Sequence, residues 1–268
     1  MICFPNAKIN LGLHVLDRRA DGYHNIETVF YPIPLRDALE VVEAEVFSFS
    51  QTGIPLDASV ENNLAVRAAR LISIYGLPPL EIHLHKAIPS GAGLGGGSSD
   101  AAFMLKLLNS FGRLGFKEEQ LEAMASRLGA DCPFFIRNTP VFASGTGNIF
   151  EPVQVSLRGF RLCLVTPGIA VSTAEAYAAL QPQIPPVSLK EIIRLPVKEW
   201  KGRMKNDFEQ SVFGKYPELA AIKQNLYEAG AVYASMSGSG SSVYGLFEEP
   251  VSKEAASVHL AEARWFSL

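Results

Sequence analysis

The chain has 268 residues, of which 48% are hydrophobic and 19% charged, with a formal net charge of −3. A chain of this size can bury a large core and lies near the length at which chains divide into two lobes. The acidic balance and the lack of any basic run exclude a general nucleic-acid-binding protein.

The chain carries no sign of secretion or of membrane attachment. Its three cysteines form no CxxC pair, which indicates neither a disulfide framework nor a zinc site. Asn6, Lys8 and Asn10 interrupt the apolar run that a signal peptide would need. The longest uncharged stretch, 229–247, is too rich in Ser and Gly to span a membrane. We therefore expect a protein of the reducing cytoplasm.

The first part of the chain is predicted to form a sheet. Residues 7–15 alternate between apolar and polar side chains, which predicts a strand with one buried face and with Lys8 on the other face. An Asp21–Gly22 turn leads into a second strand, and residues 38–50 are typical of a third.

The middle and the end of the chain alternate between helices and strands. Apolar spacing predicts helices over 59–76, 98–111 and 117–129, the first ending at Gly76 and the last at Gly129. Further strands are predicted at 80–89, 139–144 and 161–168, and two more enclose a Gly/Ser loop within 231–247. We expect a lobe boundary near residue 155, which gives lobes 1–155 and 156–268.

The stretch PSGAGLGGGSSDAAF, residues 89–103, lies between a predicted strand and a predicted helix. Three of its glycines satisfy GxGxxG, but the helix leads into another helix and not into a second parallel strand, which argues against a dinucleotide fold. The chain also lacks the P-loop motif, because its only Gly-Lys pair is followed by Tyr216, and it lacks the GxSxG motif of serine hydrolases, because Asp100 stands two residues after Ser98. Consecutive glycines and a helix N-terminus that Ser98 or Ser99 could cap are typical of a phosphate-binding loop.

The loop resembles the second motif of the GHMP family of small-molecule kinases, which includes galactokinase, homoserine kinase and mevalonate kinase. Four further stretches are similar, in the same order, to the other motifs of one branch of that family. They are residues 6–30, 62–71, 128–135 and 237–247. The branch is marked by AKINL, RADGYH and LGAD-x-PFF together. This chain departs from its pattern at Ser239, where threonine is common, and at Asn148, where glutamate is usual.

The resemblance implies an α+β fold of two lobes. The N-terminal lobe would resemble ribosomal protein S5 and contain a left-handed βαβ unit, and the C-terminal lobe would be an α/β sandwich. It also implies transfer of the ATP γ-phosphoryl group, with Mg²⁺, to the 2-hydroxyl of 4-diphosphocytidyl-2-C-methyl-D-erythritol, a step of non-mevalonate isoprenoid biosynthesis. The protein would act on this small molecule as a monomer or a homodimer.

The resemblance also assigns residues to roles. Asp131 would be the base and Lys8 the cation that keeps it ionised and stabilises the transferring charge. Tyr23 would stack on cytosine and His24 would bind its edge. Mg²⁺ would be held mainly by ATP, with Ser98 or Ser99 in reach. The residues implied for ATP are Asn63, Lys86, Pro89, Ser90, Gly91, Ala92, Gly93, Leu94, Gly95, Gly96, Gly97, Ser98 and Ser99. Those implied for the acceptor are Asn10, Tyr23, His24, Thr173, Gly238, Ser239 and Gly240.

Other interpretations of these residues remain open at this stage. Asp131 could be a helix N-cap, because Pro133 follows it at a typical first-turn position. Lys8 could be a solvated lysine on a strand, and Tyr23 could simply pack after its turn. His83 and His85 share a strand face but lack a third ligand nearby, which favours a solvated face over a metal site.

Three alternative functions also stay open. A sister GHMP kinase would act on a mevalonate-type compound, a sugar or homoserine, but would not need Tyr23 and His24 as readers of a base. A catalytically silent nucleotide-binding protein would not need both Lys8 and Asp131. An RNA-binding module is suggested by lobe shape alone, and the net charge argues against it.

Overall fold

The computed structural model describes residues 1–56, 59–178, 180–248 and 263–268, and it has a mixed α and β architecture. Contacts divide the chain into two compact units. The first comprises Met1–Lys8, Pro32–Ser90 and Gly95–Thr139, and the second Ile9–Tyr31, Gly91–Leu94 and Pro140–Leu268. The units are discontinuous because two 13-residue strands, β2 (Asn6–Arg18) and β3 (His24–Arg36), contribute residues to both. A division near residue 155 stays a prediction.

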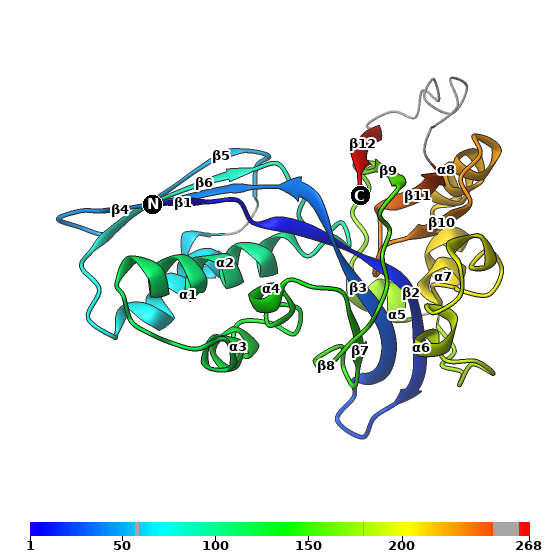
Figure 1. Ribbon diagram of the computed structural model, residues 1–268, viewed down its shortest axis with the longest axis horizontal. Helices are drawn as coiled ribbons and strands as arrows, with labels where there is room; N and C mark the ends of the chain where they lie inside the picture. Colours follow the sequence, from blue (N-terminus) through cyan, green and yellow to red (C-terminus); the bar gives the residue numbers. More distant parts are fainter. Residues whose placement is uncertain (57–58, 179, 249–262) are drawn as a thin grey trace. The chain divides into compact units, whose positions relative to one another are not determined.

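The first unit contains a four-stranded sheet with the order β1-β4-β6-β5. Its strands are β1 (Ile2–Cys3), β4 (Ala38–Glu43), β5 (Ser48–Gly53) and β6 (Leu80–Lys86). β6 pairs antiparallel with β4 and parallel with β5. The parallel pair is connected through α1 (Leu64–Ser73), which forms the expected βαβ unit. α1 and α2 (Gly96–Phe111) lie along one face of this sheet (Figure 1).

The prediction of a single strand over 38–50 is wrong. The chain bends at residues 45–46, and β4 and β5 lie on opposite sides of β6. Apolar side chains alternate on both sides of the bend, so the pattern does not reveal the reversal. The predicted ends of two helices also differ, because α1 ends at Ser73 and α3 (Glu118–Ser126) ends before Gly129.

The alternation along β6 is clean. Leu80, Ile82 and Leu84 are buried, whereas the side chains between them are exposed. The exposed His83 bonds Ser50 Oγ at 2.7 Å, and His85 bonds Thr52 Oγ1 at 2.9 Å. The two histidines thus lie on a solvent-exposed face of the strand, as expected.

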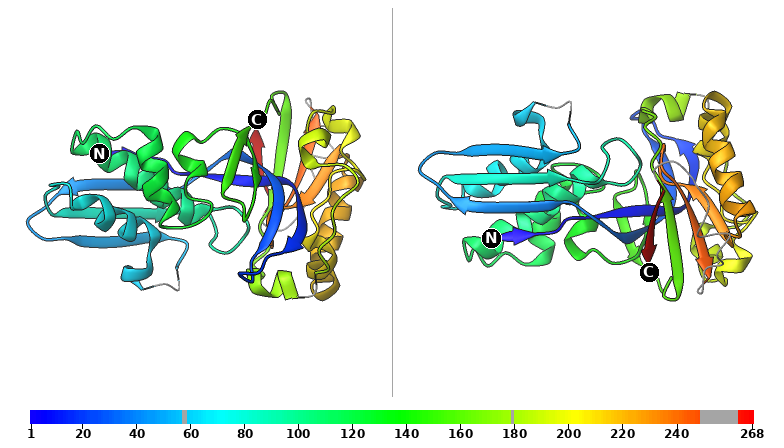
Figure 2. Two further views of the ribbon diagram at one scale, coloured as in Figure 1. Left: turned by 90° about the horizontal axis from the view of Figure 1, so that it is seen from below. Right: turned by 90° about the horizontal axis from the view of Figure 1, so that it is seen from above.

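The second unit contains an antiparallel sheet with the order β10-β11-β9-β12. Its strands are β9 (Phe160–Val165), β10 (Tyr233–Met236), β11 (Val243–Glu248) and β12 (Ala263–Ser267). Figure 2 shows α7 (Phe208–Lys215) and α8 (Pro217–Glu228), in yellow and orange, along one face of it. The hairpin predicted around the Gly/Ser loop is confirmed as β10 and β11. The sequence did not indicate β12, which pairs with β9.

The remaining sheet has the order β2-β3-β7-β8 and includes the two long strands. β7 (Val141–Ser144) matches its prediction, and β8 (Ile149–Pro152) was not expected. The prediction that β2 has one buried face is wrong, because every residue from Asn6 to Val15 is buried. Its polar side chains are buried because they find partners inside the protein. At Gly12 a Cβ would lie 2.6 Å from Leu189 Cδ2, which leaves room for no larger residue.

The shorter helices lie in the segments between these elements. They are η1 (Val60–Asn62), α4 (Phe134–Arg137), α5 (Thr173–Ala178), α6 (Leu189–Ile192) and η2 (Val197–Glu199). Within the described residues, no helix has the length and apolar character that crossing a membrane requires.

Candidate active site

Lys8 and Asp131 form an ion pair in the first unit. Lys8 Nζ lies 3.6 Å from Asp131 Oδ2, and the side chain of Lys8 is 5% exposed while that of Asp131 is 34% exposed. The open interpretation of Lys8 as a solvated lysine is therefore wrong. Asp131 is also not a helix cap, because α4 begins after Pro133, which is its N-cap residue. The pair thus joins a buried cation to a carboxylate that solvent can reach.

Burial shapes the charge of Lys8. It lowers the pKa of the Lys8 ammonium, and the carboxylate of Asp131 acts in the opposite direction. A Cβ added at Gly95 would lie 3.2 Å from Lys8 Cε and 3.0 Å from Phe135 Cζ. The start of α2 therefore packs against the stem of Lys8, and a glycine there permits the close approach.

The glycine loop ends at the N-terminus of α2. Gly95 is the N-cap residue with φ of 69°, and no side chain caps the helix. The expectation that Ser98 or Ser99 is the cap is wrong, because both lie inside the first turn. The first N–H groups of a helix have no acceptor within it and carry the positive end of its dipole. The 16-residue α2 therefore presents donors suited to an anion.

The two hydroxyls of this turn differ in access. Ser99 is fully buried and its Oγ has no hydrogen-bond partner among the described residues. Ser98 is partly exposed. Of the two serines, Ser98 is the one that a ligand can reach.

The middle of the glycine loop packs on the third glycine motif within the second unit. Ser237 Oγ donates to Gly93 O at 2.8 Å, and Ser242 N donates to Ala92 O at 3.2 Å. A Cβ added at Gly93 would lie 1.9 Å from Ser237 O. Two stretches that are far apart in the sequence are thus in backbone contact, and this contact requires glycine.

Asn10 joins β2 to the same region. Its Nδ2 donates to Thr28 Oγ1 at 2.9 Å, its backbone N donates to Ser237 Oγ at 3.1 Å, and its carbonyl accepts from Tyr244 OH at 2.8 Å. It is 2% exposed. These contacts hold Asn10 rigidly beside the third glycine motif.

Two of the residues implied for the acceptor lie together although they are 66 positions apart. Thr173 Oγ1 is 3.4 Å from Ser239 Oγ, and both hydroxyls are accessible. Gly238 and Gly240, on either side of Ser239, have φ of 57° and 89°, which favours glycine. The fold therefore brings the hydroxyls of Thr173 and Ser239 together, and the two glycines beside Ser239 are buried.

Tyr23 and His24 follow the predicted turn. Gly22 N donates to Arg19 O at 3.1 Å and Arg19 N donates to Tyr23 O at 2.8 Å, which confirms the turn. Tyr23 is 67% exposed and therefore does not pack in the core. His24 stacks on Tyr177, with ring centroids 4.6 Å apart and ring planes inclined by 16°. The motif comparison did not include Tyr177, because a tyrosine in an amphipathic helix resembles a core residue.

Asn63 and Lys86, implied for the nucleotide, have protein contacts of their own. Asn63 caps α1, with its Oδ1 accepting from Ala65 N at 2.9 Å. Lys86 is 3% exposed, and its ammonium lies between the carboxylates of Asp37 and Asp100.

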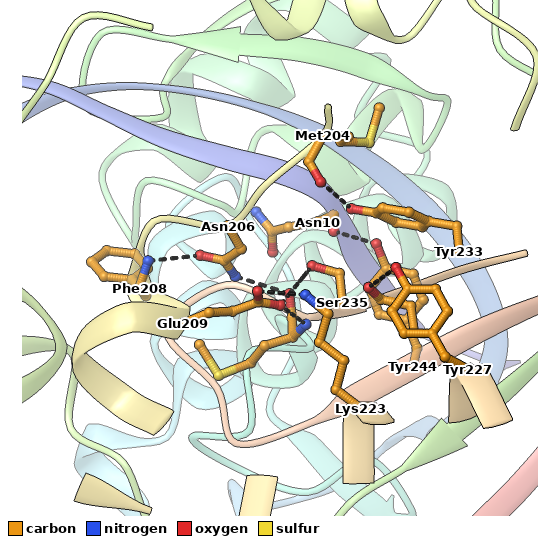
Figure 3. A network of polar contacts seen from close by, with 12 residues as sticks. Asn10, Met204, Asn206, Phe208, Glu209, Lys223, Tyr227, Tyr233, Ser235 and Tyr244 are labelled. Atoms are coloured by element: carbon orange, nitrogen blue, oxygen red, sulfur yellow. Dashed lines mark hydrogen bonds and ion pairs between the residues drawn. The ribbon is translucent and has the colours of Figure 1, made fainter. Parts of the chain in front are cut away.

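A polar network that includes Asn206 and Glu209 contacts the third glycine motif and the strand before it (Figure 3). Asn206 Nδ2 donates to Met236 O at 2.9 Å and to Gly238 O at 2.8 Å. Glu209 Oε1 accepts from Met236 N at 2.9 Å, and its other oxygen pairs with Lys223 at 2.6 Å. Sequence reasoning missed this support. The adjacent polar residues of KNDFE, just before a helix, were the available signal.

The described residues contain no group of three His, Cys, Asp or Glu side chains that could hold a metal ion. A divalent cation at this site would therefore take most of its ligands from phosphate oxygens and water, as Mg²⁺ does with nucleotides. Ser98, the partly exposed serine of the first turn of α2, fits such an arrangement.

A cavity of about 870 Å³ lies elsewhere in the second unit. Among the described residues it is lined by parts of 180–195 and 202–211 and by His14, and by none of the residues implied for ATP or acceptor. This cavity is therefore separate from the residues proposed for the substrates.

The motifs, their order and their packing agree with comparisons to known proteins. The family description "GHMP kinases N terminal domain" matches residues 63–139, and "GHMP kinases C terminal" matches residues 189–263. A protein of Parabacteroides distasonis is 66% identical over 251 residues, which cover 93% of each chain. The chain belongs to the GHMP kinase family. It is an ATP-dependent small-molecule kinase.

Curated relatives of this GHMP kinase share one name. The Parabacteroides distasonis protein is named 4-diphosphocytidyl-2-C-methyl-D-erythritol kinase. A Bacteroides fragilis protein of the same name is 57% identical, with 94% of this chain and 95% of the relative covered. A Cytophaga hutchinsonii protein, also of that name, is 48% identical with 92% of each covered.

Solved structures confirm the fold of this GHMP kinase. A crystal structure of 4-(cytidine 5'-diphospho)-2C-methyl-D-erythritol kinase matches with a TM-score of 0.83 at 34% identity, covering 99% of this chain and 97% of that chain. A mevalonate kinase matches with a TM-score of 0.71 at 15% identity, covering 99% and 98%. The second likeness shows the fold alone. Together they confirm the two-domain α+β kinase fold expected from the sequence.

Proposed function

We propose that this GHMP kinase transfers the γ-phosphoryl group of ATP to the 2-hydroxyl of 4-diphosphocytidyl-2-C-methyl-D-erythritol. The products are the 2-phosphate and ADP, and the step belongs to non-mevalonate isoprenoid biosynthesis. The observation that carries the proposal is the 66% identity to a relative of that name over 93% of both chains.

Asp131 is proposed as the base. Its accessible carboxylate takes the proton of the 2-hydroxyl while that oxygen bonds to the γ-phosphorus of ATP. The bond between the γ-phosphorus and the bridging oxygen breaks, and its electron pair leaves with ADP. Lys8, 3.6 Å from Asp131, pairs with the carboxylate and stabilises the charge that moves with the phosphoryl group.

The glycine loop and the N-terminus of α2 are proposed to bind the phosphates of ATP. The positive φ of Gly91, Gly93 and Gly95 lets successive backbone N–H groups turn toward one anion, and α2 adds its dipole. Asn63 Nδ2 is suited to an acceptor nitrogen of adenine. Mg²⁺ would neutralise charge on the phosphates, with Ser98 as a ligand from the chain.

The second unit is proposed to read the acceptor. Tyr23 offers a solvent-exposed aromatic ring, and the stacked rings of His24 and Tyr177 offer a second flat surface. Flat aromatic surfaces of this kind suit a pyrimidine base. Thr173 and Ser239 offer hydroxyl donors for a diphosphate, and the positive φ of Gly238 and Gly240 shapes the turn that presents Ser239. Asn10 completes this side of the site. A sister GHMP kinase that takes a small polyol or amino acid has no use for the aromatic surface.

We further propose a cytoplasmic enzyme, monomeric or homodimeric, that acts on a small molecule and not on a nucleic acid. Cys3, Cys132 and Cys163 are all free thiols, as expected in a reducing compartment. The chain has a formal net charge of −3, whereas proteins that bind polynucleotides usually carry an excess of basic residues.

The test is steady-state release of ADP from ATP and Mg²⁺ with four acceptors offered in parallel. They are 4-diphosphocytidyl-2-C-methyl-D-erythritol, mevalonate, galactose and homoserine. We expect turnover with the cytidine compound alone. Turnover with another acceptor would identify a sister kinase, and no turnover with any of the four would favour a silent nucleotide-binding protein.

A further inference from the structure

Three charged side chains lie together in the interior of the first unit. Lys86 Nζ donates to Asp100 Oδ2 at 2.7 Å and also to Asp37 Oδ2. The side chains of Lys86, Asp37 and Asp100 are 2%, 0% and 3% exposed. We call these three residues the buried triad.

The buried triad contacts the chain on both sides of the glycine loop. Asp37 Oδ1 accepts from the backbone N–H groups of Ala87 at 2.6 Å and Ile88 at 2.9 Å, the two residues that lead into the loop. Asp100 lies just beyond the loop, in the N-terminal part of α2. Lys86 therefore links the two ends of the loop. It contacts Asp37, which binds the residues before the loop, and Asp100, which follows the loop.

The start of α2 packs directly on the same residues. A Cβ added at Gly96 would lie 2.8 Å from Ile88 Cγ2 and 3.3 Å from Lys86 Nζ. Glycine at this position allows the entry and the exit of the loop to approach each other. The two flanks of the loop are thus fixed by packing as well as by hydrogen bonds.

We propose that the buried triad positions the glycine loop for ATP, and that Lys86 acts through the loop and not by contacting the nucleotide. This inference rests on the proposed assignment of the loop to ATP. A buried ion pair contributes little net stability after its desolvation cost, but it can fix one arrangement of the groups that it joins. A loop held in its binding arrangement beforehand loses less conformational freedom when the phosphates bind.

The charge of the triad agrees with this role. Burial raises the pKa of Asp100 to about 7, with Lys86 lowering it and Asp37 raising it. Asp100 Oδ1 has no hydrogen-bond partner among the described residues. In weakly acidic solution Asp100 is therefore mostly a neutral acid beside a Lys86–Asp37 ion pair, and an amide can replace it.

The experiment measures the Kd of ATP by titration calorimetry for the Lys86→Met, Asp37→Ala and double variants. We expect each single change to raise the Kd at least tenfold. The double variant should bind ATP no more weakly than whichever single variant has the higher Kd, because both changes disrupt the same hydrogen-bonded triad. Asp100→Leu should also weaken ATP binding, whereas Asp100→Asn should retain most of the affinity of the unchanged protein. The KM of the acceptor should change less than twofold throughout.

Two controls separate positioning from general damage. Lys106→Met removes a partly buried lysine of α2 that lies outside the triad and donates to Ile136 O at 3.0 Å, and it should leave the ATP Kd unchanged. Hydrogen exchange of residues 87–99 should quicken in Lys86→Met while exchange in α3 stays the same. This second measurement needs no Asp37 variant and so remains informative if Asp37→Ala does not fold.

The outcomes that overturn the proposal are distinct from failure of the loop assignment. If Lys86→Met weakens ATP binding while Asp37→Ala leaves it unchanged or strengthens it, Lys86 contacts the nucleotide directly. Unchanged loop exchange in Lys86→Met would also refute the positioning role. The loop itself is tested by Gly91→Asp against Gly91→Asn, since both side chains tolerate the φ of 65° and only one repels phosphate. Equal ATP affinity for that pair would reject the loop assignment.

Discussion

Lys8 Nζ lies 3.6 Å from Asp131 Oδ2, which joins β2 to the turn before α4. The lysine is buried and the carboxylate is accessible, which agrees with the proposed roles of Lys8 in stabilising charge and of Asp131 in reaching a substrate. This division of roles leads to two predictions about catalysis.

Asp131→Asn is expected to lower kcat by about 10²- to 10⁴-fold, because the amide cannot take the proton of the acceptor hydroxyl. The Kd of ATP should change little, since the variant keeps the size of the side chain. Asp17→Asn, on an exposed carboxylate that accepts from Asn25 Nδ2, serves as the matched control and should keep full activity. Near-normal turnover of Asp131→Asn would remove Asp131 as the base.

Lys8 is expected to set the alkaline limit of the reaction. Burial lowers its pKa, so as pH rises the ammonium loses its proton below the ordinary lysine value of 10.5, and kcat should fall over that range. Arg keeps its charge to higher pH. In Lys8→Arg the alkaline fall in kcat should therefore move upward or vanish, whatever the loss in absolute rate. An alkaline limb at the same pH in both proteins would assign it to another group.

Sequence patterns predicted some elements of the fold better than others. Clean alternation located β6, and apolar spacing located α2, because each element buries one face. β2 was located correctly, but its complete burial was not foreseen. The side chain of Asn10 looks solvent-facing in the pattern, yet it is hydrogen-bonded to Thr28 and Ser237 inside the protein. β12 gave no signal because its pairing with β9 is a long-range contact.

The candidate site was predictable where it depends on local motifs. The motifs named Lys8 and Asp131, and the fold brings them together. Tyr177 was missed because its position opposite His24 depends on two segments far apart in the chain. Asp37 was missed for the same reason, since nothing in its neighbourhood indicates that it holds the backbone next to Lys86.

Tyr177→Ala is expected to raise the KM of the cytidine acceptor at least about fivefold, because stacking of a base on an aromatic ring contributes roughly 1–3 kcal/mol. The KM of ATP should stay within twofold. Tyr177→Phe keeps the ring and should behave as the unchanged protein in the same assay. Equal effects of Tyr177→Ala on both substrates would discard the stacking role. Tyr23→Ala should show the same selective effect on the acceptor KM.

Ser239 tests the proposed diphosphate contact. Ser239→Ala removes a hydroxyl that lies 3.4 Å from Thr173 Oγ1 and should raise the acceptor KM several-fold. Ser239→Thr keeps the hydroxyl and should retain the KM, measured by initial rates at saturating ATP. If both variants behave alike, the hydroxyl is not a ligand of the acceptor.

Asp100 is expected to give the protein a distinctive dependence of stability on pH. Its pKa is raised from 3.8 to about 7, chiefly by burial, so its stabilising contribution is complete below about pH 4 and is lost as pH rises to about 7. The other titratable groups around it are Lys86, Asp37 and Cys3, whose thiol pKa is raised to about 12 and which therefore stays neutral.

Urea unfolding between pH 5 and pH 7 measures this contribution. Relative to Asp100→Asn, the unchanged protein should lose about 1.4 kcal/mol of unfolding free energy per pH unit. The difference should level off above about pH 7. Parallel stability curves for the two proteins would show that Asp100 is ionised throughout.

The most direct measurement of the central claim is phosphorus NMR of the reaction of ATP and Mg²⁺ with 4-diphosphocytidyl-2-C-methyl-D-erythritol. We expect one new phosphate monoester on the 2-oxygen, formed in equal amount to ADP, and none when mevalonate replaces the cytidine compound. Formation of ADP with inorganic phosphate alone, or a new ester on mevalonate, would contradict the proposed reaction.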